Sequence, residues 1–297
     1  MRVSSLSVLS FLIFINTAAN ATTPCNLNGQ GEITETVSDR PARGWCLITP
    51  QAMQIKIHYL GLCKNQPSWQ NFDSQCEQLF SSDVGQLVTV SKDDPFDLNS
   101  QISISEGTYQ YAAVFIDRNI NHASKVKFDT DRGGYSSDGN GSIGKWCWSL
   151  SGSASASRSQ DDYREYLAEC GSSEPETIGY HTSSPNYIHN NANGQPGDYS
   201  TGTTESTTWE VFLLDENRQR DGDPSPASGG VDDAKYLIGL QRFASAVEIT
   251  ANTSGVDLGF RLTNTFGVLM ADNVNDPGRD TVKQFVLGGF EFKVETD

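Results

Sequence analysis

The sequence of 297 residues lacks a long apolar run in its interior. Beyond residue 21, no stretch approaches the ~20 apolar residues that a membrane-spanning helix needs. A shorter apolar run, residues 8–15, follows Arg2 and precedes small residues that end in Ala19-Asn20-Ala21. This is the pattern of a secretory signal peptide. We therefore expect residues 1–21 to be a signal peptide, and a secreted product (periplasmic, cell-surface or extracellular) without a membrane anchor.

Basic residues are scarce. The chain has 21 Lys and Arg against 37 Asp and Glu, which gives a net charge of −16. An acidic surface repels phosphate backbones and anionic lipid, so we expect no nucleic-acid partner. Such a charge is most often a matter of solubility, with binding of divalent cations as the functional alternative.

The sequence also lacks the common catalytic and metal-binding motifs. It contains no HExxH, no Cys–His zinc cluster, no G-x-S-x-G elbow and no phosphate-binding glycine loop. Two carboxylates could hydrolyse a glycoside, but 37 acidic residues leave the pair undefined. Enzymatic activity is therefore uncertain and less expected than a non-catalytic role.

The cysteines are few and even in number, and all six lie beyond the expected signal peptide. In an exported chain this number indicates disulfide bonds. Pairing each cysteine with its nearest neighbour in the chain predicts the bridges Cys25–Cys46, Cys63–Cys76 and Cys147–Cys170.

Short alternating patterns dominate the rest of the chain. Apolar residues occupy every second position in residues 53–59, and residues 110–116 form a nearly continuous apolar run typical of a central strand. Turn residues recur at regular intervals. The pattern predicts an all-β fold, a disulfide-stapled β-sandwich of one large or two consecutive units, with one short helix.

The composition divides the chain into three parts after the signal peptide. Residues 22–150 are expected to form an N-terminal β-sandwich domain, and residues 206–297 a C-terminal β domain. The connector 151–205 is rich in loop-forming residues. Whether the two β blocks are separate domains or halves of one sandwich stays open.

One helix is expected within the connector, over about residues 160–170. Its apolar residues share one helical face through i, i+3, i+4 and i+7 spacing: Tyr163, Tyr166, Leu167 and Cys170.

The segment 129–140 resembles part of a calcium-binding loop. Asp129, Asp131 and Ser137 supply oxygen at positions one, three and nine, but no acid stands at position twelve and Arg132 intrudes. The alternative is a polar hairpin loop. We expect no cofactor, with weak calcium binding here as the one exception considered.

Trp146 and Trp148 lie on one face of a predicted strand, with Cys147 on the other. Buried, the pair would belong to the sandwich core, where tryptophan is common. Exposed, it would form a stacking platform for sugars. Both interpretations remain open at this stage.

The leading functional hypothesis is an exported, non-catalytic structural or adhesive protein of the cell surface or extracellular space. The C-terminal residues 290–295 alternate apolar and charged side chains after Gly288-Gly289. Such a strand could pair with a neighbouring copy and build a filament by strand exchange. The alternatives are a secreted glycan-binding module and a secreted hydrolase. The expected partners are a second copy of the chain or a glycan.

Overall fold

The computed structural model describes most of the chain beyond its N-terminus. The described residues are 23–36, 45–92, 104–134, 141–155, 168–184, 188–189, 196–197, 199–203, 207–220, 234–253, 256–272, 280–287 and 291–296. The expected signal peptide, residues 1–21, lies outside them.

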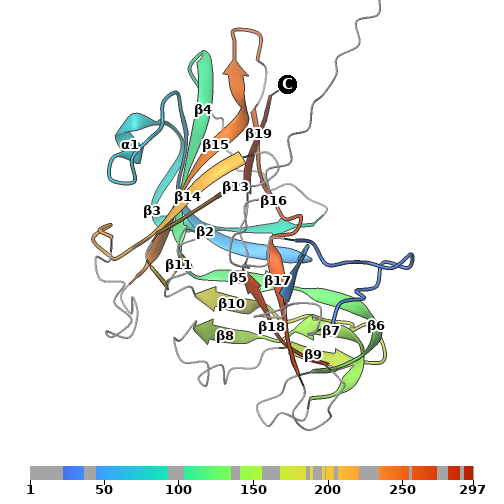
Figure 1. Cartoon of the computed structure of the whole chain (residues 1–297). Helices are drawn as coiled ribbons and strands as arrows, with labels where there is room; N and C mark the ends of the chain where they lie inside the picture. Colours follow the sequence, from blue (N-terminus) through green and yellow to red (C-terminus); the bar gives the residue numbers. More distant parts are fainter. Residues whose placement is uncertain are drawn as a thin grey trace, which may run out of the picture.

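The described part consists almost entirely of β-strands (Figure 1). In chain order the elements are β1 (Trp45–Ile48), β2 (Ala52–Cys63), α1 (Phe72–Gln75), β3 (Glu77–Ser91), β4 (Gly107–Asp117), β5 (Ile120–Ala123), β6 (Lys125–Gly134), β7 (Ile143–Ser149), β8 (Gly152–Ser155), β9 (Ala168–Gly171), β10 (His181–Ser184), β11 (Ile188–His189), β12 (Pro196–Gly197), β13 (Tyr199–Thr203), β14 (Thr207–Leu214), β15 (Tyr236–Ile249), β16 (Val256–Arg261), β17 (Phe266–Asp272), β18 (Asp280–Leu287) and β19 (Glu291–Thr296).

Two large sheets form the molecule. One has six strands in the order β1-β17-β18-β6-β7-β9. The other has nine: β13-β14-β15-β4-β2-β5-β10-β8 along its path, with β3 paired to β2. Two further pairs, β11 with β12 and β16 with β19, form small sheets of two strands. Each large sheet combines strands from residues 22–150 with strands from residues 206–297, so the two β blocks share both sheets.

The core lies against one face of the nine-stranded sheet, which we call its inner face. Near β5, the ring of Phe266 from the six-stranded sheet lies 4.2 Å from the ring of His122. Near β15, the Gln241 side chain donates to the Phe292 carbonyl at 2.6 Å and accepts from the Phe292 N–H at 2.8 Å. The inner face is therefore covered by the six-stranded sheet at one end and by β16 and β19 at the other (Figure 1).

The C-terminal strand β19 is placed within its own chain. It pairs antiparallel with β16, with Phe260 opposite Phe292, and Phe292 is only 2% exposed. Strand exchange would require β19 to leave β16 and to expose this ring. Assembly by strand exchange stays a prediction.

The three predicted disulfides are confirmed, and they staple the sandwich as expected. Sulfur atoms lie at bonding distance in the pairs Cys25–Cys46, Cys63–Cys76 and Cys147–Cys170.

The expected helix over residues 160–170 is wrong at its C-terminal end. Ala168–Gly171 is strand β9, which pairs with β7 so that Cys170 lies opposite Cys147. Ala168 and Cys170 are buried while the residues after each are half-buried, a period of two. Pairing with β7 therefore overrides the helical spacing. Residues 160–167 lie outside the described residues. Within the described residues, the helix present is the four-residue α1.

Strand β2 contains a β-bulge at His58. Before the bulge, buried side chains alternate along β2, and after it residues on both faces of the strand are buried. The register between β2 and β4 shifts between Ile57 and Tyr59. Before the shift, Ile57 packs in the core between the two large sheets, whereas after it Tyr59 belongs to a second, separate apolar cluster. A bulge inserts one residue and so reverses which face the following side chains occupy. This places aromatic residues on the outer face of the nine-stranded sheet.

Candidate functional site

Trp146 and Trp148 lie on the outer face of the six-stranded sheet. Cys147 between them is fully buried in the core, whereas both indoles are half-buried. The interpretation of the pair as part of the sandwich core is therefore wrong. Whether the pair binds sugars stays a prediction.

Charged residues flank the two indoles. In the register of β6 with β7, Lys127 lies opposite Trp146 and Lys125 opposite Trp148. The Lys127 Nζ is 5.6 Å from the centre of the Trp146 ring and 2.8 Å from a Glu32 carboxylate oxygen. Hydrogen bonds from Lys127 and Asn28 lower the pKa of Glu32.

On the Trp148 side, Lys125 pairs with Glu174. The indole of Trp148 lies against Gly171, where a Cβ would come within 3.0 Å of the ring. We call Trp146, Trp148, Lys125 and Lys127 the tryptophan face. Its lysines are already engaged by carboxylates.

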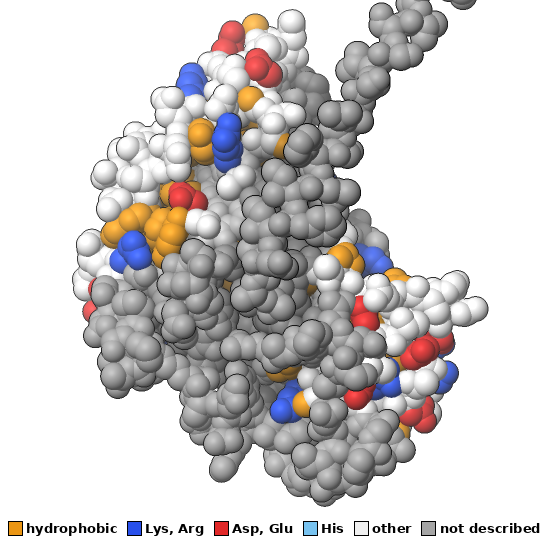
Figure 2. All heavy atoms as spheres, in the orientation of Figure 1, with side chains coloured by type: hydrophobic (Ala, Val, Ile, Leu, Met, Phe, Trp, Pro, Cys, Tyr) orange, Lys and Arg blue, Asp and Glu red, His pale blue; other side chains and the backbone are white. Residues whose placement is uncertain are grey.

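A second aromatic surface lies on the outer face of the nine-stranded sheet. Strand registers place five residues side by side across five strands: Tyr199, Phe212, Ile238, Phe115 and Tyr59. The rings of Tyr199 and Phe212 stack with centres 4.6 Å apart. Figure 2 shows an apolar patch beside basic and acidic side chains on the side where β3 and β14 lie in Figure 1.

Polar groups surround the open end of this row. The Tyr199 hydroxyl donates to Glu210 Oε1 at 3.0 Å, and Gln66 Nε2 donates to Glu210 Oε2 at 3.4 Å. Burial, and then the bond to Glu210, raise the pKa of Tyr199. The exposed guanidinium of Arg220 lies 5.6 Å from the Tyr199 ring centre and 5.5 Å from that of Phe212. We call Trp69, Tyr199, Glu210, Phe212 and Arg220 the aromatic face.

The loop between Cys63 and Cys76 adds Trp69 to the aromatic face. The loop contains α1, whose Phe72 is 3% exposed and packs edge-on against Tyr59. The half-buried Trp69 ring lies 6.1 Å from Phe212. The sequence predicts the disulfide, but it does not show that the loop folds back over the sheet. No local signal links Trp69 to Phe212, and only the sheet register brings them together.

His58 lies under the aromatic surface with both ring nitrogens engaged. Its Nε2 is 2.8 Å from Asp117 Oδ1 and its Nδ1 is 3.3 Å from the Ser82 carbonyl oxygen. The residue is 6% exposed, and its ring contacts those of Phe115 and Tyr236. Both ring nitrogens of His58 therefore have partners within the protein.

A pair of histidines lies on the inner face. His122 on β5 and His181 on β10 are 0% and 2% exposed, and their ring centres are 5.0 Å apart. Burial lowers the pKa of His181 to about 4. Burial, and then the neighbouring His181, lower the pKa of His122 well below its usual value, while the backbone of Phe285 acts in the opposite direction.

Asp129 and Asp131 do not lie in a loop. Both belong to strand β6, and Asp129 Oδ1 is 3.9 Å from the Arg132 guanidinium. The third expected ligand, Ser137, lies outside the described residues. The expectation of a loop starting at residue 129 is wrong, because β6 extends to Gly134. Its pairing with β7 is irregular between Lys127 and Arg132, however, and the register gives Asp129 and Asp131 no partner on β7. Calcium binding itself stays a prediction.

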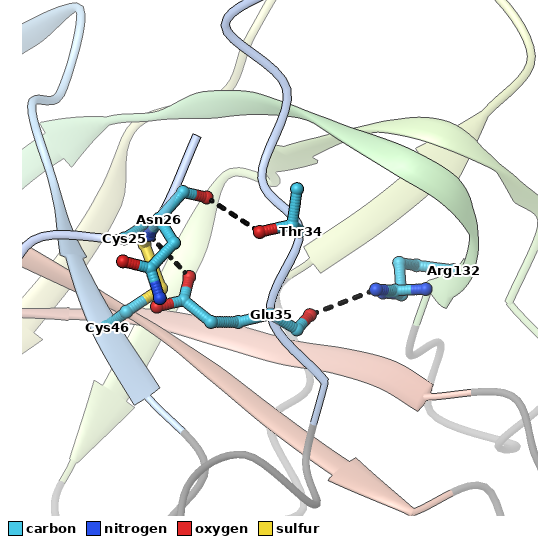
Figure 3. Close-up of a disulfide and its surroundings, with 6 residues drawn as sticks. All are labelled: Cys25, Asn26, Thr34, Glu35, Cys46 and Arg132. Carbon is cyan, nitrogen blue, oxygen red and sulfur yellow. Dashed lines mark hydrogen bonds between the residues drawn. A yellow bond between two sulfur atoms is a disulfide. The ribbon is translucent and has the colours of Figure 1, made fainter. Parts of the chain in front are cut away.

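A buried carboxylate lies beside the Cys25–Cys46 disulfide (Figure 3). Within the described residues, Cys25, Glu35 and Cys46 form the one group of three potential ligands of the types His, Cys, Asp and Glu. The two sulfurs are bonded to each other and so are not metal ligands. The Asn26 N–H donates to Glu35 Oε2 at 2.8 Å, and Arg132 donates to the Glu35 carbonyl at 3.0 Å. The group therefore anchors the N-terminal segment to β6.

Comparisons with known proteins do not place the chain in a family. No family model matches it, and searches of curated proteins and of solved structures find no match. Among the described residues, no helix is long and apolar enough to cross a membrane.

Proposed function

We propose that this protein is an exported, non-catalytic adhesive protein that binds glycans through the aromatic face. The observation that carries the proposal is the stack of Tyr199 on Phe212, with Arg220 over both rings and Glu210 at the ring edge. Sugar rings present C–H groups that pack on aromatic rings and hydroxyls that need hydrogen-bond partners. The aromatic face supplies both.

The aromatic face supports this role better than the tryptophan face does. On the tryptophan face, Lys125 and Lys127 each pair with a carboxylate, which uses part of their hydrogen-bonding capacity. On the aromatic face, the Glu210 carboxylate accepts two bonds and has lone pairs left for a ligand hydroxyl.

Export fits the three disulfides, because disulfides persist in oxidising compartments.

The experiment is a binding screen of the mature protein, with disulfides intact, against immobilised glycans. The hit is then titrated with Trp69→Ala and Tyr199→Ala. We expect each variant to weaken affinity about tenfold or more, since truncating a Trp or Tyr at the centre of a binding site typically costs about 2 kcal/mol or more. Trp148→Ala is the matched control and should bind normally.

Two results would contradict the proposal. Binding lost in Trp148→Ala but kept in Trp69→Ala would move the site to the tryptophan face. Failure of the folded protein to bind any glycan of a broad panel would remove the glycan function altogether.

A further inference from the structure

Three residues with soft or borderline ligand groups lie in one row on the inner face of the nine-stranded sheet. In the register of β2 with β5, Met53 lies opposite His122. In the register of β5 with β10, His122 lies opposite His181. Directly paired residues project from the same face with Cβ atoms roughly 5 Å apart. The thioether and the two imidazoles therefore start from adjacent positions on one side of the sheet.

All three side chains are shielded from water. Met53 and His122 are 0% exposed and His181 is 2% exposed. By distance and angle, His122 Nε2 and His181 Nδ1 are buried and have no hydrogen-bond partner, although the Phe285 backbone lies near enough to His122 to act on its pKa. Buried polar atoms are nearly always satisfied, so two orphaned nitrogens in neighbouring rings need an explanation.

The orientation of His122 matches that of a metal ligand. Its Nδ1 lies 3.2 Å from Ser124 Oγ, which leaves Nε2 as the open nitrogen. Ligating histidines commonly use one nitrogen for the metal while a nearby polar group holds the other. Ser124 is itself fixed, because its N–H donates to Ser149 Oγ at 3.0 Å.

We propose that Met53, His122 and His181 form a buried binding site for one Cu(I) ion. Thioether sulfur selects soft metal ions, and imidazole suits copper as well as zinc, so copper satisfies both ligand types. The row contains no carboxylate, which disfavours the hard cations calcium and magnesium. Phe266, 4.2 Å from His122, closes the site against the six-stranded sheet.

A metal binds the neutral form of imidazole, and both imidazole rings are buried. The site is independent of the proposed glycan function, because it lies on the opposite face of the sheet.

The test loads the full mature protein, with its disulfides intact, with Cu(I) under anaerobic ascorbate. Thiol reductants are avoided because they would open the disulfides. Competition with a colorimetric Cu(I) chelator measures affinity, and elemental analysis measures stoichiometry. We expect one copper per chain. The X-ray absorption fine structure should show one sulfur and two nitrogen neighbours.

Methionine variants provide the sharpest comparison. Met53→Leu conserves volume and should fold, and it should weaken Cu(I) affinity at least tenfold. Met270→Leu changes the other buried methionine, on β17, and should leave affinity within twofold. His181→Gln should weaken affinity a further tenfold or more.

Three outcomes would overturn the proposal. One is no copper uptake above one-tenth of an equivalent. The second is equal affinity in Met53→Leu and Met270→Leu. The third is tighter binding of Zn(II) than of Cu(I), because zinc would not need the thioether.

Discussion

The polar groups on the two faces of the nine-stranded sheet differ in their hydrogen bonding. On the outer face, the hydrogen-bonding atoms of His58, Tyr199 and Glu210 have partners within 3.4 Å, and several of these side chains reach solvent. On the inner face, His122 and His181 each keep one nitrogen without a partner although both are buried. The named polar groups of the outer face have partners and are partly open to solvent, although Ser68 Oγ in the covering loop has none. On the inner face, two imidazole nitrogens are buried without a partner.

We therefore expect substitutions on the outer face to change mainly binding, and substitutions on the inner face to change mainly stability. The inner face borders the main core, so changes there act through packing and buried polar groups. The outer face has a smaller cluster covered in part by the Cys63–Cys76 loop, so changes there can alter binding while the core persists. The bulge at His58 makes the second cluster possible, because it sends Tyr59 outward.

The largest effect is expected from Phe292→Ala on the inner side. Phe292 is 2% exposed and packs against Phe260, with ring centres 5.5 Å apart. Truncating a buried phenylalanine typically costs about 3–5 kcal/mol of unfolding free energy. Urea denaturation followed by tryptophan fluorescence measures this loss. Glycan affinity, measured well below the unfolding transition, should stay unchanged.

Trp69→Ala is the counterpart on the outer side. Because Trp69 is only half-buried, its loss should reduce stability less than the loss of Phe292 does.

If Phe292→Ala left stability intact while abolishing self-association, β19 would be a donor strand. The assignment of β19 to its own chain would then fail.

The second prediction removes the disulfide that holds the aromatic face together. Replacing Cys63 and Cys76 by alanine opens a loop with a sequence separation of 13 residues. The chain-entropy estimate for such a loop is about 3 kcal/mol of unfolding free energy. Glycan binding should fall with it, because Trp69 loses its position.

The matched control is the double variant in which Cys147 and Cys170 are replaced by alanine. This bridge joins β7 and β9, which are already paired, so stability should fall while glycan affinity persists. Equal loss of binding in both double variants would show that the aromatic face is not the binding site.

Local patterns in the sequence predict the strands and the bridges, because both depend on nearby residues. The alternation in residues 53–59 marks β2, and the apolar run in residues 110–116 marks the central β4. The disulfides follow chain proximity. The same alternation misplaces Tyr59, because nothing in the spacing reveals an inserted residue at His58.

Tertiary pairing decides what the sequence leaves open. Trp146 and Trp148 share a face by strand geometry, but which face is buried depends on where the partner sheet lies. Cys170 fits a helical spacing, yet its segment pairs with β7 as a strand. The row of Met53, His122 and His181 joins three strands far apart in the chain, and no sequence motif marks it.

The third prediction contrasts the histidines of the two faces in metal-free protein. His181 is neutral when folded, with a pKa of about 4, and ordinary when unfolded, with a pKa near 6.5. Below pH 6.5 the unfolded state therefore binds more protons, and stability falls until the folded pKa is reached. The expected loss from His181 is roughly 2–3 kcal/mol at pH 4.

Denaturation curves at pH 7, 5.5 and 4 measure this loss. His181→Gln should reduce the pH dependence, since one of the two inner-face rings with a lowered pKa is gone. His58→Gln is the outer-face control. Between pH 7 and pH 4, its unfolding free energy should fall more steeply with decreasing pH than that of His181→Gln. Identical slopes in the two variants would show that the inner pair does not govern acid stability.

The smallest effect is expected from Arg220→Ala on the outer face. The guanidinium lies 5.6 Å from the Tyr199 ring centre and 5.5 Å from the Phe212 ring centre, and its side chain is exposed. Exposed cation–π contacts contribute about 0.5–1 kcal/mol, so the unfolding free energy should change by no more than that. Glycan affinity should fall by about fivefold, because the ligand loses a hydrogen-bond donor beside the rings. Arg220→Lys keeps the charge but not the planar fork, and should recover only part of the affinity. Full recovery by lysine would mean that charge alone matters there, and an unchanged affinity in Arg220→Ala would place the bound glycan away from the stacked rings.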